Sequence, residues 1–307
     1  MEINTDTQLC GVLGHPVKHS LSPAIHNAAF QHLGLNYVYL AFPVEDVPHA
    51  IHGIRALGNL RGFSVTIPHK VSVMAHLDTI EPSARHIGAV NTIVKEDQTL
   101  SGYNTDAAGA LLALRHGGVE LAGKQVVMIG SGGAARAIAF GLALQTPANR
   151  LTILAIEEEE RRTLARDLRE GTTLPIEDHP LDANTLEPAL ARAQVMIHCT
   201  PVGMDPHIEQ TCVPQRFFHP NLTVMDIVYN PLGTRLLKEA REAGCPTIRG
   251  LEMFLHQAVA QFELWTGQPA PVPVMRQVLE SRFSQSSSPT PSPPGREPAP
   301  DSIRGPG

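Results

Sequence analysis

The chain has 307 residues, of which 42% are hydrophobic, and its formal net charge is −6. This length is sufficient for two domains, and the excess of acidic side chains argues against binding to nucleic acid or to acidic lipid. The four cysteines lie far apart, no apolar run is long enough to span a membrane, and the polar N-terminus does not have the pattern of a signal peptide, so we expect a cytoplasmic protein with reduced thiols.

The N-terminal third of the chain alternates short apolar runs with amphipathic segments, which is typical of an α/β domain. Strands are predicted over residues 9–13, 37–42 and 63–67, and helices over residues 24–33, 47–57 and 71–77. A strand over residues 90–94 and a second one near Leu100 are expected to form a hairpin, with residues 95–99 as its polar turn. A helix capped by Thr105 or Asp106 then runs to about His116.

A glycine-rich turn in the middle of the chain follows a short apolar strand, 126–129, and precedes a helix, 134–144. Gly130, Gly132 and Ala135 have the spacing G-x-G-x-x-A. Glycines at these positions let the backbone turn tightly and approach a pyrophosphate, which the free N–H groups of the helix attract. The alternative is a turn with no ligand, but the strand before it and the helix after it favour a dinucleotide site.

The α/β alternation continues after this turn. Strands are predicted over residues 151–156, 195–199, 223–228 and 246–248, and helices over residues 157–170 and 236–243. Strands separated by helices indicate a parallel sheet. We therefore predict an α/β protein with an N-terminal substrate domain (1–106), a Rossmann-type nucleotide-binding domain (107–250), two C-terminal helices that return to the first domain (251–266 and 272–283) and a disordered tail rich in Pro and Ser (284–307).

Several polar residues of the first domain are candidates for chemistry. The hydroxyls of Ser20 and Ser22 stand before a helix N-terminus and suit a carboxylate, although Ser22 is equally suited to capping the helix. Lys70 follows a strand, and it is either a solvated charge or a proton-transfer group. Asp106 is its candidate partner or, alternatively, a helix cap, and Asn91 could bind a hydroxylated substrate. The fifteen histidines show no metal-ligand spacing, so no metal is expected.

Taken together, the ordered motifs resemble those of the shikimate dehydrogenase family. They are GHPVKHSLSP (14–23), FSVTIPHK (63–70), GAVNT (88–92), GYNTD (102–106), GSGGAAR (130–136), TPVGM (200–204), DIVYNPLGT (226–234) and GLEMFLHQAVAQFELWTG (250–267). The resemblance covers residues 9–283. It implies the reversible reduction of 3-dehydroshikimate to shikimate by a nicotinamide cofactor, in the pathway that makes aromatic amino acids.

The resemblance also implies a role for individual residues. Lys70 and Asp106 are the implied proton-transfer pair. The residues implied to bind the substrate are Ser20, Ser22, Thr66, Asn91, Asp106, Tyr229 and Gln257. Those implied to bind the cofactor phosphates are Gly130, Ser131, Gly132, Gly133 and Ala134, and those beside the nicotinamide are the TPVGM segment, Ile227, Gly250 and Met253.

One segment departs from the family pattern. NADP-using members resemble Asn-Arg-Thr after the second strand of the nucleotide domain, whereas this chain has Ala155-Ile156-Glu157 followed by three more glutamates. NADP(H) is still the cofactor that we expect, with NAD(H) as the alternative. Two other functions stay open: an NAD-dependent quinate/shikimate dehydrogenase, and a non-catalytic regulator on the same fold. Because binding alone would not need both Lys70 and Asp106, the enzyme is favoured; a homodimer is the assembly considered.

Overall fold

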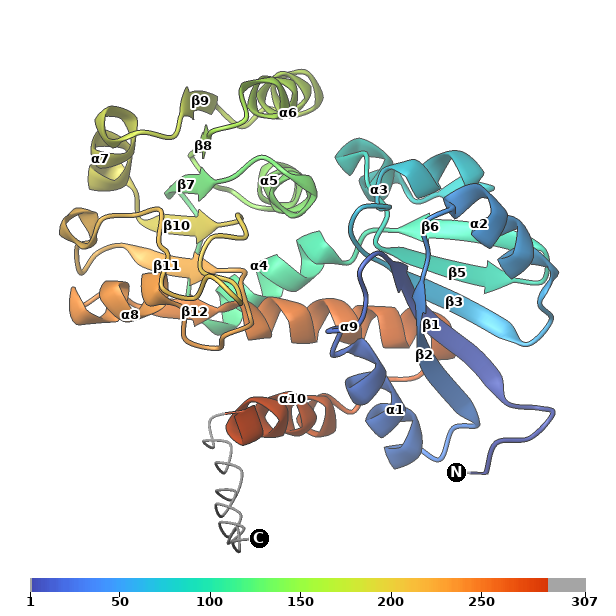
Figure 1. The fold of residues 1–307 in the computed structure, drawn as a ribbon. Coiled ribbons are helices and arrows are strands. Elements are labelled where there is room, and N and C mark those ends of the chain that lie inside the picture. The colour runs from blue at the N-terminus through green and yellow to red at the C-terminus, as the bar shows by residue number, and fades with distance from the viewer. Residues whose placement is uncertain (1, 287–307) are drawn as a thin grey trace, which may run out of the picture.

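Two six-stranded sheets lie side by side in the computed structural model, which describes residues 2–286 (Figure 1). The first sheet has the order β2-β1-β3-β5-β6-β4. Its strands are β1 (Gln8–Gly14), β2 (Tyr37–Pro43), β3 (Leu60–Val65), β4 (Thr79–Ile80), β5 (Thr92–Glu96) and β6 (Thr99–Tyr103). Strands β1, β2 and β3 are parallel, and β5 pairs in antiparallel fashion with β3 and β6, as expected for the predicted hairpin.

The helices of this part are α1 (Ser22–His32), α2 (Val47–Ala56) and α3 (Pro82–Ile87). The helix predicted over residues 71–77 is instead a single 3₁₀ segment, η1 (Ser72–His76), which ends where Leu77 turns to an extended conformation. Strand β4 and helix α3 were not predicted, because two and six residues are too few to show a period. Helix α3 is instead defined by its ends, where Glu81 accepts from Ala84 N and Gly88 adopts φ +70°.

The second sheet is entirely parallel and has the order β12-β11-β10-β7-β8-β9. Its strands are β7 (Gln125–Ile129), β8 (Arg150–Ala155), β9 (Ile176–Pro180), β10 (Val195–His198), β11 (Thr223–Asp226) and β12 (Thr247–Arg249). Its helices are α5 (Gly133–Gln145), α6 (Glu158–Gly171), α7 (Ala183–Arg192), the short 3₁₀ segment η2 (Gln215–Phe217) and α8 (Arg235–Glu242). Strand order reverses between β7 and β10, which is where doubly wound sheets bind ligands.

Three elements in this part of the chain were missed by the sequence prediction, namely β9, α7 and the three-residue segment η2. Strand β9 reads IEDHP and lies at the sheet edge, where none of its side chains is buried, so it carries no apolar run. Helix α7 contains Pro188, but the capping box of Asp182 and Thr185 fixes its first turn.

Helices α4 (Asp106–His116) and α9 (Gly250–Thr266) lie side by side and link the two sheets (Figure 1). Gly109 permits this close packing, because a Cβ there would lie 2.9 Å from the carbonyl oxygen of Met253. Helix α9 packs against β3 and β5 of the first sheet, where Trp265 Nε1 donates to Ile93 O at 3.0 Å, and α10 (Val272–Ser286) packs against α1 and α9.

The predicted fold class, including the return of the C-terminal helices, is therefore confirmed. Helix α10 extends three residues into the segment predicted to be disordered, and residues 287–307 lie outside the described part of the chain.

Candidate active site

Lys70 and Asp106 form an ion pair at the edge of the first sheet. Lys70 comes shortly after β3, and Asp106 is the first residue of α4. The lysine Nζ donates to Asp106 Oδ2 at 2.6 Å, and the two side chains are 20% and 8% exposed. Lys70 is therefore not a solvated charge. An ammonium group has three N–H donors, so this pairing leaves others for a substrate.

The second oxygen of Asp106 is fixed by Asn91. Asn91 Nδ2 donates to Asp106 Oδ1 at 2.8 Å and to Thr105 Oγ1 at 2.9 Å, while its Oδ1 accepts from Thr105 N at 2.8 Å. Thr105 occupies the cap position of α4, as predicted, but its side chain makes no capping bond among the described residues, and Asp106 is the first residue of the helix. The carboxylate of Asp106 is thus held in one orientation toward Lys70.

The loop after β1 lies against the loop after β3. A Cβ at Gly14 would lie 2.3 Å from Thr66 Cγ2, and His15 N donates to Ile67 O at 3.0 Å. Because parallel neighbouring strands end at the same sheet edge, the two loops bring Ser20 and Ser22 to the same edge as Thr66 and Lys70.

The prediction that Ser22 caps α1 is wrong. Ser22 is the first residue of the helix, and Leu21 occupies the cap position. Instead, Ser20 Oγ accepts from Ser22 N at 3.3 Å, while the Ser22 side chain is buried. A helix-capping role therefore does not account for the Ser22 hydroxyl.

Tyr229 lies in the loop after β11, and Gln257 lies on the linking helix α9. Gln257 is buried on α9 against Gly109, one turn along α4 from Asp106, and its Nε2 donates to Phe254 O at 2.8 Å. The Tyr229 ring lies 4.7 Å from that of Phe254, and burial raises the pKa of the Tyr229 phenol. The phenol is therefore protonated at neutral pH and can donate a hydrogen bond.

The glycine-rich turn has the shape that a dinucleotide phosphate needs. Gly130 adopts φ +114°, and a Cβ there would lie 3.1 Å from the Cys199 carbonyl oxygen. Gly132 occupies the cap position of α5, and a Cβ at Gly132 or Gly133 would meet no described atom within 4 Å. The first N–H groups of α5 thus have open space in front of them, as an anion site requires.

The loop after β11 packs against the start of α9. A Cβ at Gly250 would lie 2.4 Å from Ile227 O, and Met253 is buried one turn further along the helix. Ser131 and Ala134 are partly exposed beside the glycines, and the Ser131 hydroxyl donates to Glu160 Oε2 at 3.4 Å.

The arginines that follow the glutamate run point to carboxylates. Arg162 pairs with Glu158 at 2.7 Å, and Arg161 pairs with Asp178 at 3.2 Å. Burial raises the pKa of Asp178, but its hydrogen bonds to Arg169 and Arg161 lower it more, so that the net shift is downward and the carboxylate stays charged. Ile156 is 75% exposed at the end of β8. The 2′-phosphate of NADP(H), if it lay at the end of β8, would therefore be near carboxylates and near arginines that are already paired.

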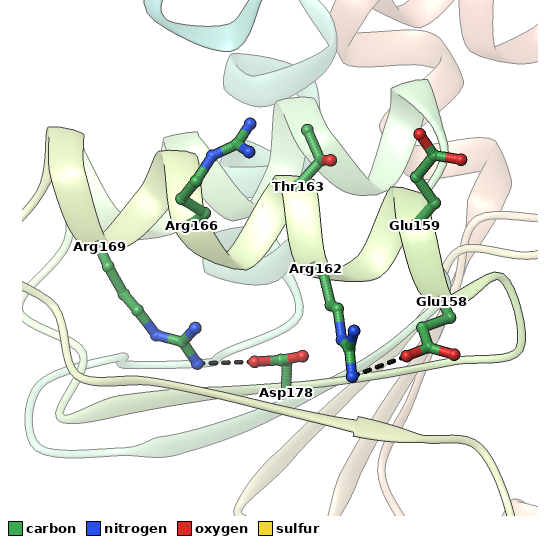
Figure 2. Close-up of a pocket in the computed structure, with 7 residues that line it drawn as sticks. All are labelled: Glu158, Glu159, Arg162, Thr163, Arg166, Arg169 and Asp178. Atoms are coloured by element: carbon green, nitrogen blue, oxygen red, sulfur yellow. Dashed lines mark hydrogen bonds and ion pairs between the residues drawn. The ribbon is translucent and has the colours of Figure 1, made fainter.

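A surface hollow of about 720 Å³ lies over α6 and β9, away from Lys70. Figure 2 shows that Arg162 and Arg169 turn toward Glu158 and Asp178, respectively, on one side of α6. None of the predicted site residues lines this hollow, and its charges are largely paired among themselves. It does not mark the site of chemistry.

Sequence reasoning missed a buried polar chain beneath Asn91. Tyr39 Oη donates to Ser64 Oγ at 2.6 Å, Ser64 Oγ donates to Gln261 Oε1 at 2.7 Å, and Gln261 Nε2 donates to Thr92 Oγ1 at 3.0 Å. Thr92 Oγ1 in turn donates to Asn91 Oδ1 at 2.7 Å. A signal was present, because Gln261 stands four residues after Gln257 in an otherwise apolar helix face.

Comparisons with known proteins identify the family of this chain. Residues 12–93 match the family model described as shikimate dehydrogenase substrate binding domain, and residues 250–280 match the shikimate 5'-dehydrogenase C-terminal domain. Shikimate dehydrogenase (NADP(+)) of Moorella thermoacetica is 45% identical over 290 residues, which cover 94% of this chain and 97% of that protein. The chain belongs to the shikimate dehydrogenase family.

Solved structures of this family are similar over almost their whole length. Shikimate 5-dehydrogenase of Listeria monocytogenes, in complex with shikimate and NAD, has a TM-score of 0.86 and 37% identity, over 91% of this chain and 98% of that one. Quinate dehydrogenase of Corynebacterium glutamicum, in complex with NAD, has a TM-score of 0.83 and 29% identity, over 90% and 99%. Among the described residues of this shikimate dehydrogenase family member, no helix is long and apolar enough to cross a membrane, and no cluster of side chains could hold a metal ion.

Proposed function

We propose that this chain catalyses the reversible reduction of 3-dehydroshikimate to shikimate with NADP(H), and that it also accepts NAD(H). The observation that carries the proposal is the ion pair of Lys70 and Asp106, oriented by Asn91 and still partly open to solvent. A regulator that only bound a ligand would not need a lysine held in this way.

Lys70 is the proposed proton donor to the substrate oxygen. In the reduction, the bound nicotinamide supplies the hydride to the carbonyl carbon. The Lys70 ammonium would stabilise the negative charge that develops on the oxygen and donate the proton. Asp106 would orient the lysine through their ion pair. In the reverse direction the neutral amine of Lys70 would accept the proton of the hydroxyl.

The remaining polar residues are proposed to bind the substrate. Ser20 and Ser22 would hold its carboxylate through their hydroxyls, because they stand at the N-terminus of α1. Thr66, Asn91 and Asp106 would bind the ring hydroxyls. Tyr229 and Gln257 would complete the pocket from the side of α9.

The residues of the second sheet fit a dinucleotide. Gly130, Gly132 and Gly133, with Ser131 and Ala134, would hold the pyrophosphate at the open end of α5. Ile227, Gly250 and Met253 would line the nicotinamide end. The fit is weaker at the adenosine ribose, where Ile156 stands in place of the family's arginine and is followed by Glu157.

A quinate dehydrogenase is the second candidate, favoured by the structural similarity to the quinate dehydrogenase of Corynebacterium glutamicum. The test is to follow cofactor absorbance with shikimate and with quinate, each with NADP⁺ and NAD⁺. The proposal predicts the largest kcat/KM for shikimate. Turnover of quinate alone would replace it with the second candidate, and folded protein inactive in all four assays would favour a regulator.

The domain bounds 1–106, 107–250 and 251–283, the homodimer and the cytoplasmic location stay predictions from the sequence. Light scattering coupled to size-exclusion chromatography tests the dimer, and cell fractionation tests the location.

A further inference from the structure

His198 is the last residue of β10, at the point where the strand order of the second sheet reverses. The glycine-rich turn lies directly beside it, because a Cβ at Gly130 would be 3.1 Å from atoms of both Cys199 and Thr200. His198 itself is only 1% exposed. It therefore cannot touch a ligand, and any effect that it has on the site must pass through its neighbours.

The imidazole ring of His198 joins the ends of two strands. Its Nδ1 lies 2.9 Å from Asp226 Oδ1 at the end of β11, and its Nε2 lies 2.5 Å from Thr200 Oγ1 in the loop after β10. Thr200 Oγ1 also accepts from Val202 N at 3.2 Å. The hydroxyl of Thr200, which His198 holds in place, thus fixes the backbone just after β10.

Asp226 extends the same network to the next loop. It is fully buried, and its Oδ1 also accepts from Val228 N at 3.0 Å. Its Oδ2 accepts from Thr234 Oγ1 at 2.6 Å, and the Thr234 hydroxyl caps α8 by accepting from Leu237 N at 3.3 Å. The Asp226 carboxylate therefore bonds the loop after β11 directly and the loop after β10 through His198.

The charge of this carboxylate is balanced by His198. Burial alone would lower the pKa of His198, but hydrogen bonds and charge interactions with Asp226 and Cys212 raise it to about 10. At neutral pH both ring nitrogens then carry a proton, so that one donates to Asp226 and the other to Thr200. Without the ring, a buried carboxylate would lose its charged partner.

From this geometry we propose that His198 is a positioning residue that holds the loops after β10 and β11 in place for the nicotinamide end of the cofactor. The inference rests on the proposed function, because these loops meet a nicotinamide only if the chain binds a dinucleotide at the switch point. It adds a residue that acts through Thr200 and Asp226 rather than by contact.

The test separates the two ends of the cofactor. In His198→Asn, the shorter amide can keep a donor to Asp226 but no longer reaches Thr200; Thr200→Val removes the acceptor at nearly constant shape. Each variant should weaken NADPH binding about tenfold, as expected for one hydrogen bond to a charged group, and leave binding of 2′,5′-ADP, which has no nicotinamide, unchanged. The double variant should be no weaker than either single one. His219→Asn is the matched control, because among the described residues the His219 side chain bonds only Leu190 O, at 3.0 Å.

Three outcomes would overturn the inference: unchanged NADPH binding in His198→Asn, an equal loss for NADPH and 2′,5′-ADP, or additive effects in the double variant. If His198→Asn does not fold, unchanged NADPH binding in Thr200→Val overturns the inference, and a selective loss there supports it. Binding is measured without substrate. A wild-type chain that binds NADPH but does not oxidise shikimate would therefore refute the proposed function and leave the binding data to decide the role of His198.

Discussion

The molecule contains two acid–base pairs of similar chemistry and opposite accessibility. Lys70 and Asp106 lie 2.6 Å apart at the edge of the first sheet, and the lysine side chain is 20% exposed. His198 and Asp226 lie 2.9 Å apart at the carboxyl ends of β10 and β11 in the second sheet, and their side chains are 1% and 0% exposed. A pair that reaches solvent can exchange a proton with a substrate, whereas a sealed pair can only hold its surroundings in place. Burial, rather than residue type, separates the proposed roles.

The largest effect is expected when the accessible cation, Lys70, is removed. Lys70→Ala should lower kcat about 10²- to 10⁴-fold, the usual contribution of a positioned acid or base, and change the KM for shikimate much less. Lys238→Ala, which removes an exposed lysine of α8, is the control and should leave both constants unchanged. Steady-state kinetics measures the effect. Turnover within a few-fold of wild type would mean that Lys70 takes no part in proton transfer.

Removing the buried cation, His198, should lower the stability of the folded protein. His198→Ala should lower the free energy of unfolding by about 3–5 kcal/mol near pH 6, because it leaves the Asp226 carboxylate buried without its partner. The folded-state pKa of His198 is about 10 against an ordinary value of 6.5, so the stabilisation is complete below pH 6.5 and is lost as the pH rises toward 10.

Denaturant titrations of wild type and His198→Ala across this pH range measure the difference. It should shrink steadily above pH 6.5. A gap that is constant with pH would show that His198 is not protonated in the folded protein.

A smaller effect is expected from the hydroxyls that are proposed to bind the substrate carboxylate. Ser20→Ala and Ser22→Ala should each raise the KM for shikimate roughly 10- to 100-fold, since each loses a hydrogen bond to a charged group. Their kcat values should change less than that of Lys70→Ala. Ser281→Ala on α10 is the matched control. An unchanged KM in both variants would exclude these hydroxyls from the site.

The smallest effect concerns the choice of cofactor. Glu157→Arg should shift the ratio of kcat/KM for NADPH over NADH upward about two- to fivefold, the range of an exposed ion pair, because a 2′-phosphate gains a cation. Glu187→Arg makes the same charge change on an exposed position of α7 and should leave the ratio unchanged. Equal ratios in both variants would show that Glu157 does not face the ribose.

The sequence predicted the two-domain fold better than the contacts between side chains that are distant in the chain. The glycine spacing and the strand before it are local, so the turn at Gly130 could be read directly from the chain. Strand β9 could not, because an exposed edge strand has no apolar run. The bond between His198 and Asp226 joins residues 28 positions apart, and only the pairing of β10 with β11 brings them together. No local pattern marks such a pair.

The assignment of Lys70 as the proton donor is tested most directly by a single-turnover experiment on wild type and Lys70→Ala, combined with equilibrium binding of NADPH. Each protein is loaded with NADPH and mixed rapidly with 3-dehydroshikimate, and loss of the reduced cofactor is followed. We expect rapid oxidation in the wild type, and in Lys70→Ala equal NADPH affinity with oxidation slowed at least about 10²-fold. Oxidation at a similar rate in both proteins would contradict the assignment of Lys70 as the proton donor.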